Sequence, residues 1–151
     1  MSSDGTAQRR ALPNAIIAVR AISPDERWVI ATVPAGEELA QLSTQSLPFE
    51  GGRPVLVGGR CFPAWTVDGK ALYISLQPDM GGEGVTAAIP LKPGAMLPPL
   101  PPAGIRNRAD LEKIPGARIV PFDSATFAPG LASYAYTKTT AQRNLYRIPL
   151  P

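Results

Sequence analysis

Two stretches decide the fold class of this chain of 151 residues: Ile22-Ser23-Pro24-Asp25-Glu26-Arg27-Trp28-Val29-Ile30-Ala31 and Trp65-Thr66-Val67-Asp68-Gly69-Lys70-Ala71-Leu72-Tyr73-Ile74. In each, a polar turn containing an aspartate separates two apolar runs, and a basic residue follows two positions after that aspartate. Asp25 and Asp68 lie 43 residues apart, so the sequence predicts a repeated unit of about that length.

A second pattern supports this period, an apolar residue on each side of a proline. It occurs at Leu47-Pro48-Phe49, Ile89-Pro90-Leu91 and Ile148-Pro149-Leu150. The first two prolines are 42 residues apart and the last two are 59 apart, which implies an insertion of about 16 residues in the last unit. We expect these prolines near the ends of strands, where a missing N–H costs little.

A third pattern is a glycine that follows a turn-forming residue. Gly5, Gly51 and Gly94 are spaced by 46 and 43 residues. A period of about 40–45 residues with four strands per unit is typical of propeller blades. Short runs rich in Val, Ile, Tyr and Leu, separated by Gly, Pro, Asp and Ser, fit such strands.

The predicted fold class is all-β, a partial propeller of about three four-stranded antiparallel blades. Residues 1–13 would end a preceding blade, 15–58 and 60–97 would be blades, 98–116 a Pro-rich insertion, and 117–151 a last, incomplete blade. The predicted strands are 16–22, 28–33, 42–49 and 54–57, then 61–65, 71–76, 85–91 and a short piece near Met96, then 117–121, 133–138 and 144–150. One helical turn is expected at 108–113.

Asp4-Gly5 is typical of a hairpin turn, which would place Met1 inside a repeat. We therefore expect the chain to be a fragment of a longer protein. An open arc of blades exposes apolar faces and strand edges. The expected partners are the remaining blades of the same propeller or another copy of it, and the isolated chain is expected to associate.

The two quoted stretches resemble the Ser-Pro-Asp-Gly-Lys-aromatic repeat of TolB-like, WD-repeat-like bacterial propellers. Glu26 stands where that repeat usually has Gly, and Val67 where it has Pro. The stretch 134–151 is similar to the C-terminal propeller region of some bacterial membrane-bound serine/threonine protein kinases. The resemblance implies a non-catalytic module that binds or senses a protein or small ligand, in a membrane-anchored signalling protein with a periplasmic or extracytoplasmic propeller.

An alternative stays open: the chain would be the propeller part of a serine peptidase or another hydrolase with its catalytic residues elsewhere. The chain itself has no kinase motif and no Gly-x-Ser-x-Gly. It also has no histidine, which excludes Ser-His-Asp and Cys-His arrangements and every imidazole metal site.

The remaining composition excludes further classes. A net charge of +3 without clustered basic residues argues against a nucleic-acid partner. A single cysteine excludes an internal disulfide and a thiolate metal cluster. No apolar run reaches the ~20 residues of a membrane span, so we expect no membrane contact within this chain and find no targeting signal.

Several residues invite a functional interpretation, and we expect each to be structural. Asp25 and Asp68 are expected to close tight turns. Trp28 and Trp65 are expected to pack between blades, as are four tyrosines: Tyr73, Tyr134, Tyr136 and Tyr146. Cys61 lacks a histidine base and is expected to be a small buried residue in a strand.

Two further segments also invite a functional interpretation. Gly81-Gly82-Glu83-Gly84 lacks the Lys-Ser/Thr of a phosphate loop and is expected to be a hairpin loop. The Pro-rich 97–102 segment either is recognised as polyproline II or acts as a stiff spacer. The sequence thus predicts no catalytic, cofactor-binding or metal-binding residue and no cofactor.

Overall fold

The protein is described by a computed structural model that defines residues 15–35, 42–77 and 84–138. The first part of the chain forms a four-stranded antiparallel sheet in the order β1-β2-β3-β4. Its strands are β1 (Ala18–Ile22), β2 (Trp28–Pro34), β3 (Leu42–Pro48) and β4 (Val55–Gly58). The sheet is made of consecutive hairpins, because each strand pairs with the next one in the chain.

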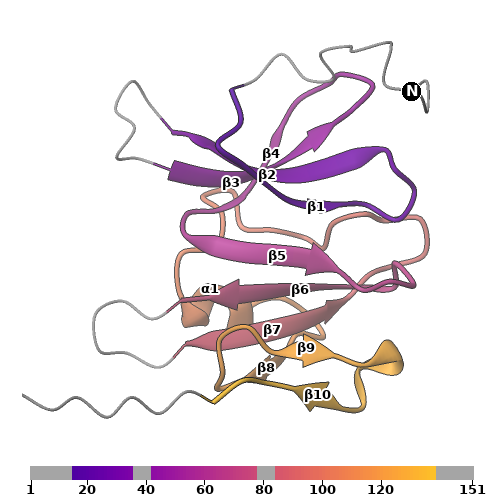
Figure 1. Cartoon of the computed structure of the whole chain (residues 1–151), viewed down its shortest axis with the longest axis vertical. Coiled ribbons are helices and arrows are strands. Elements are labelled where there is room, and N and C mark those ends of the chain that lie inside the picture. The colour runs from indigo at the N-terminus through magenta and orange to yellow at the C-terminus, as the bar shows by residue number, and fades with distance from the viewer. Residues whose placement is uncertain (1–14, 36–41, 78–83, 139–151) are drawn as a thin grey trace, which may run out of the picture.

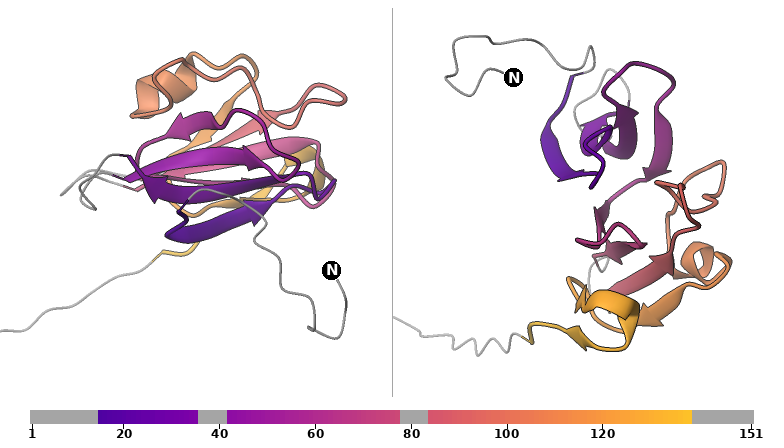
Figure 2. Two further views of the ribbon diagram at one scale, coloured as in Figure 1. Left: turned by 90° about the horizontal axis from the view of Figure 1, so that it is seen from above. Right: turned by 90° about the vertical axis from the view of Figure 1, so that its right-hand side faces the viewer.

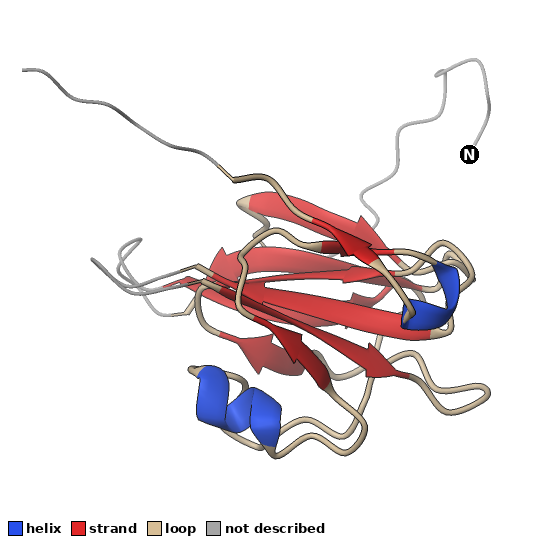
Figure 3. Cartoon of the chain, turned by 90° about the horizontal axis from the view of Figure 1, so that it is seen from below, coloured by secondary structure: helices blue, strands red, loops and turns tan. Residues whose placement is uncertain are grey.

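A second four-stranded antiparallel sheet has the order β5-β6-β7-β8. Its strands are β5 (Cys61–Trp65), β6 (Ala71–Leu76), β7 (Val85–Pro90) and β8 (Arg118–Val120). A third, two-stranded sheet pairs β9 (Thr126–Phe127) with β10 (Tyr134–Ala135). Two short helical segments, α1 (Arg108–Glu112) and the 3-10 turn η1 (Pro129–Leu131), lie beside the strands (Figure 3).

The three sheets follow one another along the long axis of the molecule (Figure 1), and a view from the side shows the same succession (Figure 2). Successive side chains of a strand point to opposite faces of a sheet, and in the second sheet both faces carry apolar side chains. Leu72, Ile74 and Ile89 point toward the first sheet and pack with its Ile30 and Val57. Each such fully buried side chain contributes about 1.5–3 kcal/mol.

The opposite face of the second sheet packs on the third. Ala88 and Val120 contact Phe127 in a smaller buried cluster, against which Tyr73 and Tyr134 also pack. Arg118 of β8 donates a hydrogen bond to the carbonyl of Leu131, which holds the turn between β9 and β10 against the second sheet. The chain is therefore all-β, with sheets that stack face to face.

The strands of the first unit lie where the sequence predicts them, and so do the first three strands of the second. Pro48 ends β3 and Pro90 ends β7, as expected of the apolar-Pro-apolar pattern. The helical turn is confirmed as α1, which Asn107 caps by accepting a hydrogen bond from the backbone of Asp110 at 3.1 Å. Pro149 and the predicted strand 144–150 lie outside the described residues.

Two strand assignments are wrong. No strand forms near Met96, and residues 118–120, predicted to open the third unit, are the last strand of the second sheet. They pair with β7 through Thr86↔Val120, Ala87↔Ile119 and Ala88↔Arg118. The residues of a short apolar run do not indicate which strand it pairs with, and the long connection before residues 118–120 leaves their register with β7 unpredictable from the sequence. The third unit begins instead at β9, a strand that the sequence pattern did not predict.

The long connection between β7 and β8 packs back on the first sheet. Ile105 forms an isolated parallel bridge with Gly58, and its N–H bonds to the carbonyl of Val57 at 2.8 Å. A side chain at Gly58 would meet the carbonyl oxygen of Ile105 at 2.3 Å, so only glycine permits this approach. The connection thereby covers part of the free edge of β4.

Candidate functional site: the repeated turns and a groove beside the first strands

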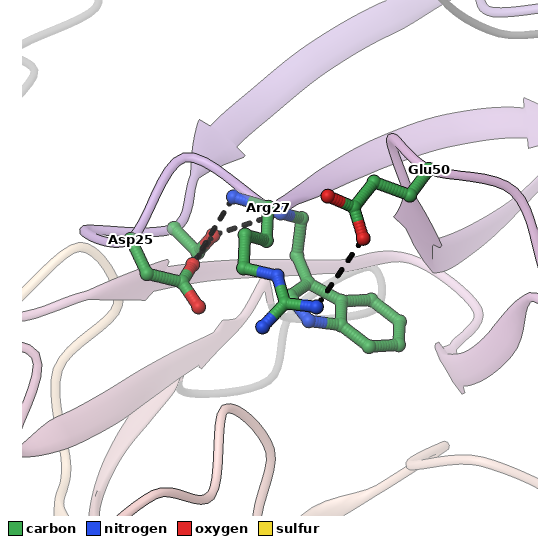
Figure 4. A network of polar contacts seen from close by, with 5 residues as sticks. Asp25, Arg27 and Glu50 are labelled. Carbon is green, nitrogen blue, oxygen red and sulfur yellow. Dashed lines mark hydrogen bonds and ion pairs between the residues drawn. The ribbon is translucent and has the colours of Figure 1, made fainter.

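The turn between β1 and β2 is closed by a side-chain network (Figure 4). Ser23 accepts a hydrogen bond from the backbone N–H of Trp28 at 2.9 Å and donates one to Asp25 at 2.5 Å. The same Asp25 oxygen accepts from the N–H of Arg27 at 3.1 Å. The Arg27 guanidinium lies 3.3 Å from a carboxylate oxygen of Glu50, and this exposed ion pair adds little to stability.

The turn between β5 and β6 repeats this network 43 residues later. Thr66 accepts from the N–H of Ala71 at 3.0 Å and donates to Asp68 at 2.7 Å. Asp68 accepts from the N–H of Lys70 at 3.1 Å. The two aspartates therefore occupy equivalent positions in successive sheets, as the repeat predicts.

The turn between β9 and β10 has the same backbone hydrogen bonds but none of this side-chain network, and its Gly130 has φ of 79°, a left-handed conformation that neither Asp25 nor Asp68 adopts. The N–H of Ala128 bonds to the carbonyl of Ser133 at 2.9 Å, matching Ser23 to Trp28 and Thr66 to Ala71 at the same distance. Glu26, Gly69 and Leu131 hold the same place, with φ of 57°, 68° and 61°. Ala128 and Gly130 stand at the positions of the hydroxyl residue and the aspartate. Backbone hydrogen bonds thus identify a third turn of this kind, although its residues do not follow the pattern of the first two.

These contacts assign both aspartates a structural use. Hydrogen bonds from Ser23 and from the N–H of Arg27 lower the pKa of Asp25, and those from Thr66 and the N–H of Lys70 lower the pKa of Asp68. Both carboxylates remain ionised at neutral pH and accept hydrogen bonds from residues of their own turns. Two similar environments do not separate an acid from a base.

A groove of about 380 Å³ lies where β1, the first strand of the first sheet, packs against β5, the first strand of the second sheet. Phe62 and Ala64 of β5 form one side with Tyr73 and Ser75 of β6. Val19 and Arg20 of β1, Gln77 and residues 124–126 complete it. The size is at the lower end of the range for small-molecule sites.

A buried hydrogen-bond network fixes the wall formed by residues 124–126. The hydroxyl of Thr86, a fully buried residue of β7, accepts from the N–H of Ala125 at 3.2 Å and donates to the carbonyl of Phe122 at 2.7 Å. Ser75 bonds to the same hydroxyl at 2.9 Å. The adjacent Ser124 has φ of 58°, a left-handed conformation that costs a non-glycine residue about 1 kcal/mol. The second sheet thus holds the wall in a defined, strained conformation.

Arg20 is the cation of the groove. Its Nε donates to the Thr32 hydroxyl at 2.8 Å, and its guanidinium carbon lies 4.7 Å from the ring centre of Phe62. In the described parts of the chain, no carboxylate forms an ion pair with Arg20. The two contacts orient the guanidinium, and among the described residues no side chain accepts a hydrogen bond from its terminal N–H groups.

The two tryptophans and Cys61 have structural positions. Trp65 is buried in the cluster between the first two sheets, Trp28 packs against that cluster, and the Trp65 indole donates to the carbonyl of Met96 at 2.7 Å. Cys61 is buried at the start of β5, and burial raises its pKa to about 11, so its thiol stays protonated at neutral pH.

The remaining candidates lie in or near loops. Gly84 precedes β7 and packs closely on Asp123, since a side chain there would meet the Asp123 Cβ at 2.4 Å; residues 81–83 and Tyr146 lie outside the described residues. Leu97 and Leu100 of the Pro-rich segment pack against the main core, which favours the spacer interpretation. Tyr136 stacks on Phe122 with ring centres 3.7 Å apart.

Sequence reasoning did not find the groove. Its lining comes from positions 19 to 126, and a lone arginine in a strand carries no motif. Within residues 15–35, 42–77 and 84–138, no cluster of three or more metal-ligating side chains occurs, and no helix is both long and apolar enough to cross a membrane. Comparison of the chain with models of protein families, with curated proteins and with solved structures gave no match.

Proposed function

We propose that this chain is a non-catalytic binding module built from propeller-type units, and that the groove beside β1 and β5 is its ligand site. The groove carries the proposal, because it combines apolar side chains, several neutral hydroxyl and amide groups and one oriented cation. A concave site that places polar groups beside apolar side chains is typical of small-ligand sites, and here the apolar residues are Val19, Phe62, Pro63, Ala64 and Ala125. The repeated turns and stacked sheets support the propeller-type construction.

A non-catalytic role fits the chemistry of the candidate groups. The chain has no histidine, the Cys61 thiol is protonated at neutral pH, and the carboxylates of Asp25 and Asp68 serve their turns. In this proposal the module belongs to a larger signalling protein, as the resemblance to kinase-linked propellers suggests. Further blades from the same protein or another copy would complete its ring.

A screen of small fragments against the isotopically labelled chain tests the ligand site. We expect hits that shift the backbone signals of Tyr73, Gln77 and Ser124 together, because these residues line one groove. Ala64→Phe places a larger side chain into the groove and should weaken such hits at least tenfold. Val67→Phe is the matched control, because Val67 is 99% exposed at a turn outside the groove.

The screen can contradict the proposal in two ways. Hits that shift only residues outside the groove would place the ligand site elsewhere. Hits that survive Ala64→Phe unchanged, while that variant keeps the fold of the wild type by its amide spectrum, would also reject the groove as the site.

A further inference from the structure

We infer that the groove selects a small organic carboxylate with an apolar body, which Arg20 binds through its guanidinium. This inference rests on the proposed function and names its ligand class. Its physical basis is the combination, in one cavity, of an oriented cation with apolar side chains such as Val19, Phe62 and Ala64.

The charge of the groove favours an anion. Among the described residues that line the groove, Arg20 is the only charged one, and the other polar groups belong to Tyr73, Ser75, Gln77, Ser124 and Thr126. These neutral groups donate or accept hydrogen bonds, and none contributes a competing negative charge at neutral pH. An anion entering the groove therefore meets attraction from Arg20 and no repulsion from the lining.

The geometry of Arg20 favours a carboxylate. Thr32 holds Nε at 2.8 Å, which leaves the two terminal nitrogens as a planar pair of donors. Such a pair matches the two oxygens of a carboxylate and forms two parallel charge-assisted hydrogen bonds. Because Thr32 and Phe62 orient the side chain before binding, less rotamer freedom is lost.

The rest of the groove favours an organic body over a bare inorganic anion. About 380 Å³ far exceeds the space of a single oxyanion. Phe62, Ala64 and Val19 offer apolar contact beside the cation, and Gln77 and Ser124 can bond to an amide. An N-acylated apolar amino acid, or the C-terminal residue of a peptide, carries this combination of groups.

The test compares N-acetyl-phenylalanine with N-acetyl-phenylalanine amide, which differ in the carboxylate charge. Titration is followed by the side-chain Nε–H signal of Arg20 and the backbone signals of Gln77 and Ser124. We expect the acid to bind at least tenfold more tightly than the amide, since hydrogen bonds to a charged group are worth about 1.5–3 kcal/mol. Affinity for the acid should fall with added salt.

Variants assign the selectivity to Arg20. Arg20→Gln should remove the preference for the acid, and Arg20→Lys should keep part of it, because a single ammonium retains charge without the two-pronged geometry. Arg53→Gln is the control, an equal loss of charge at an exposed residue outside the groove.

Each outcome separates the two proposals. Equal binding of acid and amide in the groove, unaffected by Arg20→Gln, would overturn the carboxylate inference and leave the ligand site standing. Inorganic phosphate binding as tightly as the acid would also overturn it, because the apolar body would then contribute nothing. Absence of any groove shift with acid or amide, together with groove hits from neutral fragments, would reject the inference alone; absence of all groove hits would reject both.

Discussion

The turns of the first two units and the turn of the third share their backbone hydrogen bonds and differ in the side chains that support them and in the conformation of one residue, Gly130. In the first two, a hydroxyl residue and an aspartate bond to the turn, through Ser23 and Asp25 and through Thr66 and Asp68. In the third, Ala128 and Gly130 occupy those positions and the backbone hydrogen bonds remain. The comparison teaches that the sheet pairing and packing specify this hairpin, while the side-chain network adds stability to it.

The largest expected effect comes from removing the hydroxyl of Thr66. Thr66→Val keeps the shape of the side chain, leaves the buried N–H of Ala71 without its side-chain acceptor, and removes one of the two hydrogen bonds that Asp68 accepts. We expect the free energy of unfolding to fall by about 1–3 kcal/mol. Denaturant unfolding of both proteins, with equal slopes, measures the difference.

Two matched variants sharpen this result. Thr137→Val makes the same chemical change at an exposed residue and should change stability by less than about 0.5 kcal/mol. Ala128→Thr introduces the hydroxyl into the third turn and should leave it folded with equal or slightly greater stability. A loss from Thr137→Val as large as that from Thr66→Val would show that the turn network is not the cause.

The next largest effect on stability concerns the turn residue with positive φ, which is Gly69 in the second unit and Glu26 in the first. Gly69→Glu forces a side chain into a left-handed conformation and brings its Cβ to 3.3 Å from the Pro24 ring. We expect a loss of about 1–2 kcal/mol in the free energy of unfolding. The reverse change at the equivalent position, Glu26→Gly, should be neutral or stabilise the chain by up to about 1 kcal/mol, because it relieves the same strain.

Val67→Glu controls for the added charge in the Gly69 experiment, because Val67 is in the same turn, is 99% exposed and has no positive φ. It should change stability by less than about 0.5 kcal/mol. Thermal unfolding of all four proteins at one pH compares them directly. Opposite signs for Gly69→Glu and Glu26→Gly would support the equivalence of the two turns, and equal signs would break it.

The smallest effect is the pH dependence of the two carboxylates. Hydrogen bonds lower the pKa of Asp25 and of Asp68 in the folded chain from 3.8. A lowered pKa gives stability that is fully present well above pH 3.8 and is lost as the pH falls below it. The wild type should therefore exceed the Asp25→Asn/Asp68→Asn variant in stability at pH 7, and the difference should shrink below pH 3.8.

Unfolding midpoints of the wild type and this double variant from pH 7 to pH 2.5 measure the effect. Both carboxylates are exposed, so water and salt screen much of their interaction and the difference should be small. A wild-type advantage that grows as the pH falls would contradict the assignment of ionised carboxylates to these turns.

The sequence predicted the first two units, whose turns contain a hydroxyl residue and an aspartate, and predicted only in part the third, whose turn contains neither. The Asp-containing turns and the apolar-Pro-apolar pattern located seven strands and the equivalence of the first two hairpins, because the aspartates bond within their own turns and the prolines end strands. In the third hairpin, β10 lies within the predicted strand 133–138, whereas β9 was not predicted, and Ala128 and Gly130 replace the hydroxyl residue and the aspartate of the other two turns.

The sequence by itself therefore determined the all-β class, the repeat of about 43 residues and the structural role of Asp25 and Asp68, since these depend on alternation and on contacts within a turn. Only the tertiary structure decided that β8 completes the second sheet, that Ile105 bridges to Gly58, and that Arg20 faces a groove. Those features depend on which distant segments meet, for example Thr86 with residues 122–125, and a strand's own residues do not encode its partner.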